Sequence, residues 1–166
     1  MKVLVATASK YGSTHEIGQA LGDALSERGV IVQVVKMQDV KTLVPFDAVV
    51  LGSAIYAGQW LKDAREFVDV HALGLTERPV WLFSSGPVGE PPLPSEENIQ
   101  IDSIVMTTGA RDHKVFAGKI DKSRLSLAHR ALVKALKAPV GDFRDWDEIR
   151  AWGASIAEAL NSPVPS

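Results

Sequence analysis

Hydroxyl side chains and a glycine occupy a short segment that follows the first apolar run of the chain. Residues 9–14 read Ser-Lys-Tyr-Gly-Ser-Thr and offer three Ser and Thr hydroxyl groups, a glycine that lets the backbone approach a ligand closely, and the free N–H groups of a helix start. This combination is suited to binding an anion, and a phosphate in particular. A simpler interpretation is a capped helix, because Ser13 and Glu16 have the spacing of a capping box. That interpretation leaves the other hydroxyls and the glycine without a role.

Two further segments are suited to a flat ligand. Residues 53–60 read Ser-Ala-Ile-Tyr-Ala-Gly-Gln-Trp, so that Tyr56 and Trp60 flank Gly58, and an aromatic ligand could stack on either ring. The alternative is that both rings are structural, with Trp60 under the following helix and Tyr56 over the end of the sheet. For Trp60 taken alone, this alternative is favoured. Residues 84–89, Ser-Ser-Gly-Pro-Val-Gly, supply small side chains and free amides.

Several common site types are absent from the sequence. Residues 9–14 match neither the G-x-x-x-x-G-K-[ST] loop nor the G-x-G-x-x-G fingerprint, which disfavours a nicotinamide dinucleotide bound in the Rossmann manner. Ser-His-Asp hydrolysis would need a G-x-S-x-G elbow that the chain lacks. No metal site is predicted, because the histidines have neither zinc spacing nor an i, i+4 pair. They are His15, His71, His113 and His129.

The elements that position these segments are short apolar runs alternating with amphipathic stretches, which predicts parallel strands joined by helices. The predicted strands cover residues 3–7, 30–35, 48–52, 80–84 and 113–117, and the predicted helices cover residues 13–28, 60–72, 96–108, 122–137 and 145–160. Asp145 and Glu148 repeat the capping spacing at the last helix. The predicted fold class is an α/β three-layer sandwich with a five-stranded parallel sheet of order 2-1-3-4-5.

This architecture brings the candidate segments together. Ligands of open α/β sheets bind beyond the carboxyl ends of the strands, near the point where the strand order reverses, here between the first and third strands. All three segments follow such strand ends. We predict one domain over residues 1–162 and a short tail at 163–166, since 166 residues are typical of one domain.

Composition limits the chemistry further. The chain has no cysteine, which excludes disulfides, thiolate zinc sites, iron–sulfur clusters and cysteine nucleophiles, so redox chemistry would require a cofactor. With 18 basic and 20 acidic residues the net charge is −2, which disfavours nucleic acid as a partner. No apolar run reaches the roughly 18 residues of a membrane span. The apolar first six residues are predicted to be a strand rather than a secretory signal, so the expected compartment is the cytoplasm.

On these segments the sequence resembles the flavodoxin-like family of FMN-binding proteins. Residues 9–14 look like the S/T-x-T-G-x-T phosphate loop of that family, with Tyr11 in place of the commoner Thr. The chain is most similar to the flavodoxin-domain subgroup that includes menaquinone-dependent protoporphyrinogen oxidase. The matching pieces cover nearly the whole length: residues 11–17 (Tyr-Gly-Ser-Thr-His-Glu-Ile), 52–56 (Gly-Ser-Ala-Ile-Tyr), 115–118 (Val-Phe-Ala-Gly) and 145–149 (Asp-Trp-Asp-Glu-Ile).

The resemblance implies a flavodoxin-like sandwich with FMN as the cofactor, and it implies which residues contact FMN. The phosphate would be bound by Ser9, Lys10, Tyr11, Gly12, Ser13 and Thr14; the flavin ring would be flanked by Tyr56, Ala57, Gly58 and Gln59; its pyrimidine edge would contact Ser85, Gly86, Pro87 and Gly89. The flavin N5 would carry the hydride or electron transfer, so no catalytic side chain is named. We also expect the Gly58 peptide to turn toward N5.

The resemblance leaves two function classes open. The first is an FMN-dependent oxidoreductase, protoporphyrinogen-oxidase-like, that passes electrons from a small-molecule or tetrapyrrole substrate to a quinone or redox-protein acceptor. The second is a non-enzymatic flavodoxin-type electron carrier. Carriers are usually strongly acidic, which a net charge of −2 does not match. The oxidase has a long basic insertion, where this chain has a short, proline-rich and mildly acidic segment at residues 86–112.

A basic stretch from Lys119 to Lys137 adds a prediction about location. It carries six positive charges, against Asp121, beside an apolar stripe. Such a stretch is usually a solvated helix face. The alternative is weak contact with an anionic lipid surface, where a quinone would be available, which would place the protein at the membrane periphery.

Overall fold

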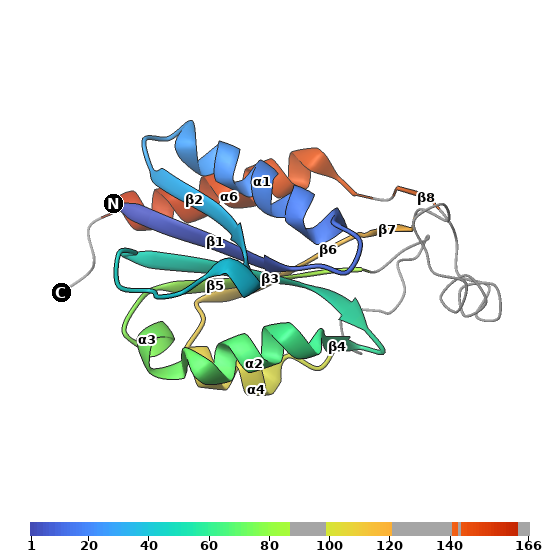
Figure 1. The fold of residues 1–166 in the computed structure, drawn as a ribbon. Coiled ribbons are helices and arrows are strands. Elements are labelled where there is room, and N and C mark those ends of the chain that lie inside the picture. Colours follow the sequence, from blue (N-terminus) through green and yellow to red (C-terminus); the bar gives the residue numbers. More distant parts are fainter. Residues whose placement is uncertain (87–98, 121–140, 143, 163–166) are drawn as a thin grey trace.

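Five parallel strands form the central sheet, in the order β2-β1-β3-β5-β6 (Figure 1). The structure is a computed structural model that describes residues 1–86, 99–120, 141–142 and 144–162. The parallel strands are β1 (Lys2–Ala8), β2 (Ile31–Lys36), β3 (Ala48–Tyr56), β5 (Val80–Ser85) and β6 (Asp112–Phe116). Counted in chain order, these five strands have the predicted order 2-1-3-4-5, so the fold-class prediction is confirmed.

A sixth strand of the sheet corrects one predicted helix. β4 (Gln59–Trp60) turns back antiparallel to the end of β3, with Trp60 opposite Ile55. The prediction of a helix over residues 60–72 is therefore wrong at both ends: α2 spans Lys62–Val70, and a separate short helix, α3, spans Ala72–Thr76. The hairpin buries the Trp60 ring, which is 1% exposed. Burial of this large ring thus outweighs the helical spacing of the apolar residues.

Helices cover both faces of the sheet, as Figure 1 shows. α1 (Ser13–Ser26) and α6 (Trp146–Asn161) lie on one face; α2, α3 and α4 (Asp102–Thr108) lie on the other. Each face has its own buried apolar cluster, and the neighbours Leu82 and Phe83 on β5 belong to opposite clusters. This alternation is expected of a strand that is covered on both sides.

The two predicted helix caps have different outcomes. At α6, Asp145 is the N-cap, and its Oδ1 accepts a hydrogen bond from the Glu148 N–H at 3.1 Å, as predicted. At α1, the predicted capping box is wrong, because Gly12 is the N-cap and Ser13 is already the first helical residue. The chain enters α1 through a left-handed residue, φ 89° at Gly12, a conformation that favours glycine over serine.

The remaining elements are short. α4 begins at Asp102, and Gln100, which the sequence predicts to be helical, instead forms a β-bridge with Gln59. Residues 96–98 of that predicted helix lie outside the described residues. A 3₁₀ turn, η1 (Met37–Asp39), follows β2, and β7 (Lys119–Ile120) pairs with β8 (Gly141–Asp142). The predicted helix at residues 122–137 and the tail at 163–166 lie outside the described residues.

The two edges of the sheet differ in what they carry. Figure 1 shows that β1 begins and α6 ends at one edge, whereas the carboxyl ends of β1, β3 and β5 point to the opposite edge. The loops that leave these carboxyl ends contain the predicted site residues.

Candidate functional site at the carboxyl edge of the sheet

The loop between β1 and α1 folds around the hydroxyl of Ser9. Its Oγ accepts hydrogen bonds from the backbone N–H of Gly12 at 2.9 Å and of Thr14 at 3.4 Å. With Gly12 in the left-handed region, the loop curls back and ends at the N-terminus of α1. The first N–H groups of a helix have no partners within the helix, and they attract an anion.

The hydroxyl of Ser13 lies in the first turn of α1 and is buried. Among the residues that the structure describes, no hydrogen-bond partner is found for its Oγ. Leaving a buried hydroxyl unpaired costs about 1–3 kcal/mol. A phosphate oxygen at the helix N-terminus would give this hydroxyl an acceptor. The donors of the loop therefore suit an oxyanion.

A cavity of about 470 Å³ opens beside the loop, between β1, η1 and the start of α2. This volume is typical of small-molecule sites. Besides Ser9, Lys10, Tyr11 and Gly12, its walls include side chains that sequence reasoning did not select: His15, Lys36, Gln38 and Asp63. Lys36 ends the parallel strand β2, and Gln38 lies in the turn that follows it. This position at the carboxyl edge is the signal that could have identified them.

His15 is bonded to the end of β1. Its Nδ1 lies 2.8 Å from the hydroxyl of Thr7, which is itself buried. Burial lowers the pKa of His15 below its ordinary value of 6.5, the positive charge of Lys36 lowers it further, and Glu16 opposes both. His15 is therefore neutral at neutral pH.

The β3–β4 turn carries the predicted ring-flanking residues Tyr56, Ala57, Gly58 and Gln59. Ala57 has φ 53° and Gly58 has φ 77°, as is typical of the tight type I′ turns that form two-residue hairpin loops. The Tyr56 ring is 53% exposed at the start of this turn. The Gly58 carbonyl accepts a hydrogen bond from the Gln100 N–H at 2.7 Å, so the predicted turning of this peptide would have to break that bond.

Trp60 is buried and offers no exposed ring on which a ligand could stack, in agreement with the structural role that the sequence favoured. Its indole N–H donates to Ser84 Oγ at 2.8 Å, and Ser84 Oγ lies 2.6 Å from His113 Nε2. The Ser84 hydroxyl can accept from Trp60 and donate its own hydrogen to His113 Nε2 at the same time, so both bonds form together. The chain of three side chains ties the β3–β4 turn to β5 and β6.

The end of β5 is closed by an approach of two glycines. A Cβ on Gly118 would lie 2.7 Å from the Cα of Gly86, and the Gly86 N–H donates to the Phe116 carbonyl at 3.4 Å. Only glycine allows the two backbones to pass this closely. Gly118 ends the Val-Phe-Ala-Gly piece of the sequence, which identified the segment without explaining this role.

The described part of the chain holds neither a metal-ligand cluster nor a membrane-spanning helix. Residues 1–86, 99–120, 141–142 and 144–162 contain no group of three or more His, Asp or Glu side chains placed to hold a metal ion. In the same part of the chain, no helix is long and apolar enough to span a bilayer.

Comparison of the sequence with known proteins identifies the family of the chain. The family model described as flavodoxin domain matches residues 4–147. The chain belongs to the flavodoxin domain family. It is 24% identical to the protoporphyrinogen IX dehydrogenase (quinone) of Escherichia coli K12, over 99% of this chain and 99% of that protein.

Solved structures show the same fold. An archaeal flavodoxin superposes with a TM-score of 0.67 at 22% identity, covering 98% of this chain and 100% of that one. Oxidised flavodoxin 1 from Bacillus cereus superposes with a TM-score of 0.65 at 16% identity, again covering 98% of this chain and 100% of that one.

Membership of this family implies FMN as the cofactor. The residues present fit it, because the helix N-terminus after Gly12 and the buried Ser13 hydroxyl suit a phosphate that carries close to two negative charges. Ser9–Thr14, Tyr56–Gln59, Ser85 and Gly86 all lie at the carboxyl edge of the sheet. Pro87 and Gly89 lie outside the described residues, and the contacts of the whole set with FMN stay a prediction.

Proposed function

We propose that the chain is an FMN-dependent oxidoreductase that passes electrons from a small reduced substrate to a quinone, with a protoporphyrinogen-type tetrapyrrole as the first substrate to test. The full-length similarity to protoporphyrinogen IX dehydrogenase (quinone), at 24% identity, carries this proposal. The net charge of −2 supports an enzyme over a carrier, because a carrier uses strong negative charge to find basic partners.

The proposed roles of the residues follow from their positions. Ser9 holds the loop in shape, and the N–H groups of α1 together with the Ser13 hydroxyl bind the phosphate. The turn at Tyr56–Gln59 lies along one side of the flavin ring, and Ser85 and Gly86 contact its polar edge. When bound, FMN supplies hydride or electron transfer at its N5 atom, and the protein orients the ring.

Reconstitution followed by turnover tests the proposal. The purified full chain is mixed with FMN, and the visible spectrum reports binding. The loaded protein is then given protoporphyrinogen IX and a menaquinone analogue without oxygen, and formation of fluorescent protoporphyrin is followed. We expect steady turnover that depends on FMN and on the quinone. Bound flavin without turnover would favour the electron carrier instead.

The setting of the proposed reaction is also a proposal. We place it in the cytoplasm, with quinone reached at an anionic lipid surface through the stretch from Lys119 to Lys137. Residues 121–140 of that stretch lie outside the described residues. Co-sedimentation with anionic vesicles at low salt is the expected result, and none with neutral vesicles.

A further inference from the structure

Arg144, just before α6, contacts the first turn of α1 from a position far away in sequence. Its side chain is 3% exposed, and its guanidinium lies over the ring of Trp146 at 4.5 Å. One terminal nitrogen donates to the Ser13 carbonyl at 3.5 Å, and the same nitrogen lies 3.5 Å from the carboxylate of Glu16. Arg144 therefore connects the segment before α6 to the start of α1, next to the loop of residues 9–14 (the proposed phosphate loop).

The contact with Ser13 acts on one peptide group of the loop. The carbonyl of Ser13 and the N–H of Thr14 belong to the same peptide unit. Arg144 holds the carbonyl, while Ser9 Oγ accepts from the N–H at 3.4 Å. This peptide is thus fixed at both ends, by one nearby and one distant side chain.

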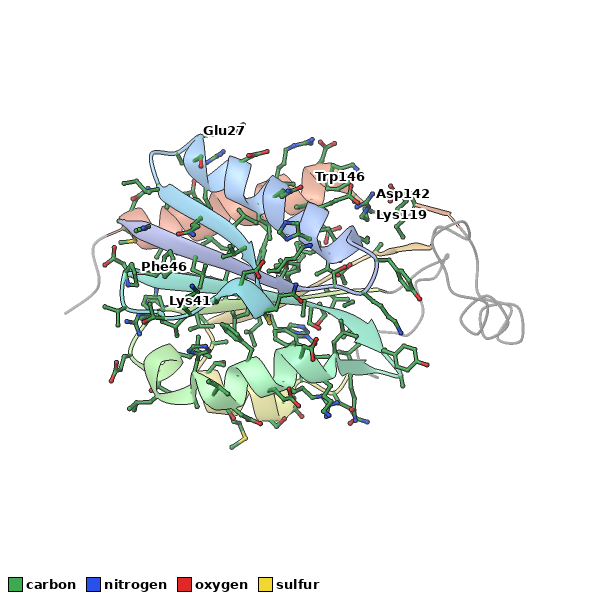
Figure 2. The ribbon with its side chains drawn as sticks, in the orientation of Figure 1. Glu27, Lys41, Phe46, Lys119, Asp142 and Trp146 are labelled. Carbon is green, nitrogen blue, oxygen red and sulfur yellow. The ribbon has the colours of Figure 1, made fainter. Side chains whose placement is uncertain are left out.

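Within the described part of the chain, the charges that interact with Arg144 or with its partner Asp142 balance. Its guanidinium bonds both oxygens of Asp142, at 2.9 and 2.8 Å, and the same bonds hold the pKa of Asp142 below its ordinary value. Lys119 lies opposite Asp142 in the antiparallel β7–β8 pair, and its positive charge also lowers the pKa of Asp142. Figure 2 labels these two residues and Trp146 close together at this end of the molecule. The four charges of Lys119, Asp142, Arg144 and Glu16 sum to zero.

Removing Arg144 would change this sum beside the loop. Glu16 and Asp142 would then outweigh Lys119 by one negative charge. Glu16 lies within the first turns of α1, close to where a phosphate would bind, and its charge would repel that phosphate. The buried guanidinium of Arg144 therefore also neutralises the carboxylate of Glu16, which would otherwise repel a bound anion.

We propose that Arg144 is a positioning residue of the phosphate loop, which fixes the Ser13–Thr14 peptide and neutralises Glu16, so that the site prefers FMN over riboflavin. Riboflavin is the matched probe, because it has the same ring and ribityl chain but no phosphate. The inference rests on the proposed placement of the FMN phosphate at residues 9–14.

The test compares the dissociation constants of FMN and riboflavin for the full apoprotein, measured by flavin fluorescence. In R144M we expect FMN binding to weaken by about tenfold, the effect of one charge near a helix N-terminus, with riboflavin binding unchanged. R144K, which keeps the charge, should retain most of the preference for FMN. The double variant R144M/E16Q should recover most of the lost FMN affinity, because it removes the opposing carboxylate as well.

Two single variants keep the test decisive even if R144M folds poorly. E16Q alters an exposed side chain and should tighten FMN binding by about threefold, with riboflavin unaffected. R150M removes an equal charge from an exposed pair with Asp147 on α6 and should change neither constant.

Three results would overturn the inference. They are equal weakening of both flavins in R144M, an unchanged FMN constant in E16Q, and the same loss in R150M as in R144M. Equal binding of the two flavins by the wild-type chain would instead contradict the proposed placement of the phosphate.

Discussion

The β1–α1 loop (residues 9–14), where we propose that the phosphate binds, and the β3–β4 turn lie at the same edge of the sheet, but they are held in different ways. In the loop, Ser9 bonds two amides within five residues of itself. The turn depends on distant strands: Trp60 bonds Ser84, and the Gly58 carbonyl bonds the Gln100 N–H. The first region is built mainly from its own sequence, and the second from its surroundings.

This difference has a physical consequence for the cofactor. Apart from the contact of Arg144 with the Ser13 carbonyl, the loop forms its own hydrogen bonds, so its shape depends little on the rest of the fold. A turn held by side chains from three strands changes shape when any of those strands shifts. We therefore expect changes near the loop to affect phosphate binding selectively, and changes beneath the turn to affect stability and ring binding together.

Gly118→Ala should have the largest effect. It changes the end of β5, where we propose that the flavin ring binds. The new Cβ would lie 2.7 Å from the Cα of Gly86, which is backbone and cannot rotate away. Overpacking of this kind costs about 1–3 kcal/mol. Urea unfolding should show the loss, and riboflavin binding should weaken too. Gly74→Ala is the matched control, since the two atoms nearest its new Cβ are the ends of the Leu43 and Arg78 side chains, at 3.2 and 3.3 Å. Equal stability of the two variants would contradict the close approach.

Ser84→Ala should be the next largest change. It leaves the buried indole N–H of Trp60 without its acceptor, which costs about 1–3 kcal/mol. Trp60→Phe removes the donor, and combining the two changes should cost less than the sum of the single losses. Unfolding free energies of the four proteins give the coupling directly. Strict additivity would mean that the Trp60–Ser84 bond contributes nothing.

Ser9→Ala tests the self-contained loop. It removes the acceptor for the Gly12 and Thr14 amides, and loss of a comparable helix cap costs about 1 kcal/mol. FMN affinity should fall by about tenfold while riboflavin affinity is kept, the reverse of the result at Gly118. Ser9→Thr retains the hydroxyl and serves as the control. An equal loss of affinity for FMN and riboflavin would show that the loop and the proposed ring-binding residues are not independent.

The smallest effect concerns pH. Burial lowers the pKa of His15 below 6.5, so the unfolded chain takes up this proton more readily than the folded one. The contribution of His15 to stability is therefore present above pH 6.5 and is lost as the pH falls through its lowered pKa. Urea unfolding at pH 7.5 and 5.5 should show a smaller acid loss in His15→Gln than in the wild type. His71→Gln, which alters another histidine with a lowered pKa, separates the two contributions.

The same contrast explains what the sequence could and could not predict. The Asp145 cap follows from a pattern within a few residues, and the strand order follows from the general topology of open α/β sheets; both are confirmed. The Ser13 cap has the same spacing and is wrong, because the loop needs a left-handed residue directly before the helix. The place of Trp60 in β4 and the contact of Arg144 with α1 depend on segments far apart in the chain. No local pattern encodes them.

The position of the start of β1 and the end of α6 relative to the candidate site has a practical consequence. β1 begins and α6 ends at the edge of the sheet opposite the loops (Figure 1). A dye or surface linker attached at Met1 would therefore leave the loops facing away from the support. On an electrode, that orientation would hold the proposed FMN site at the far side of the sheet, so we expect direct electron exchange to be slow. Attachment through an introduced cysteine near Tyr56 would bring that site close and make the exchange fast.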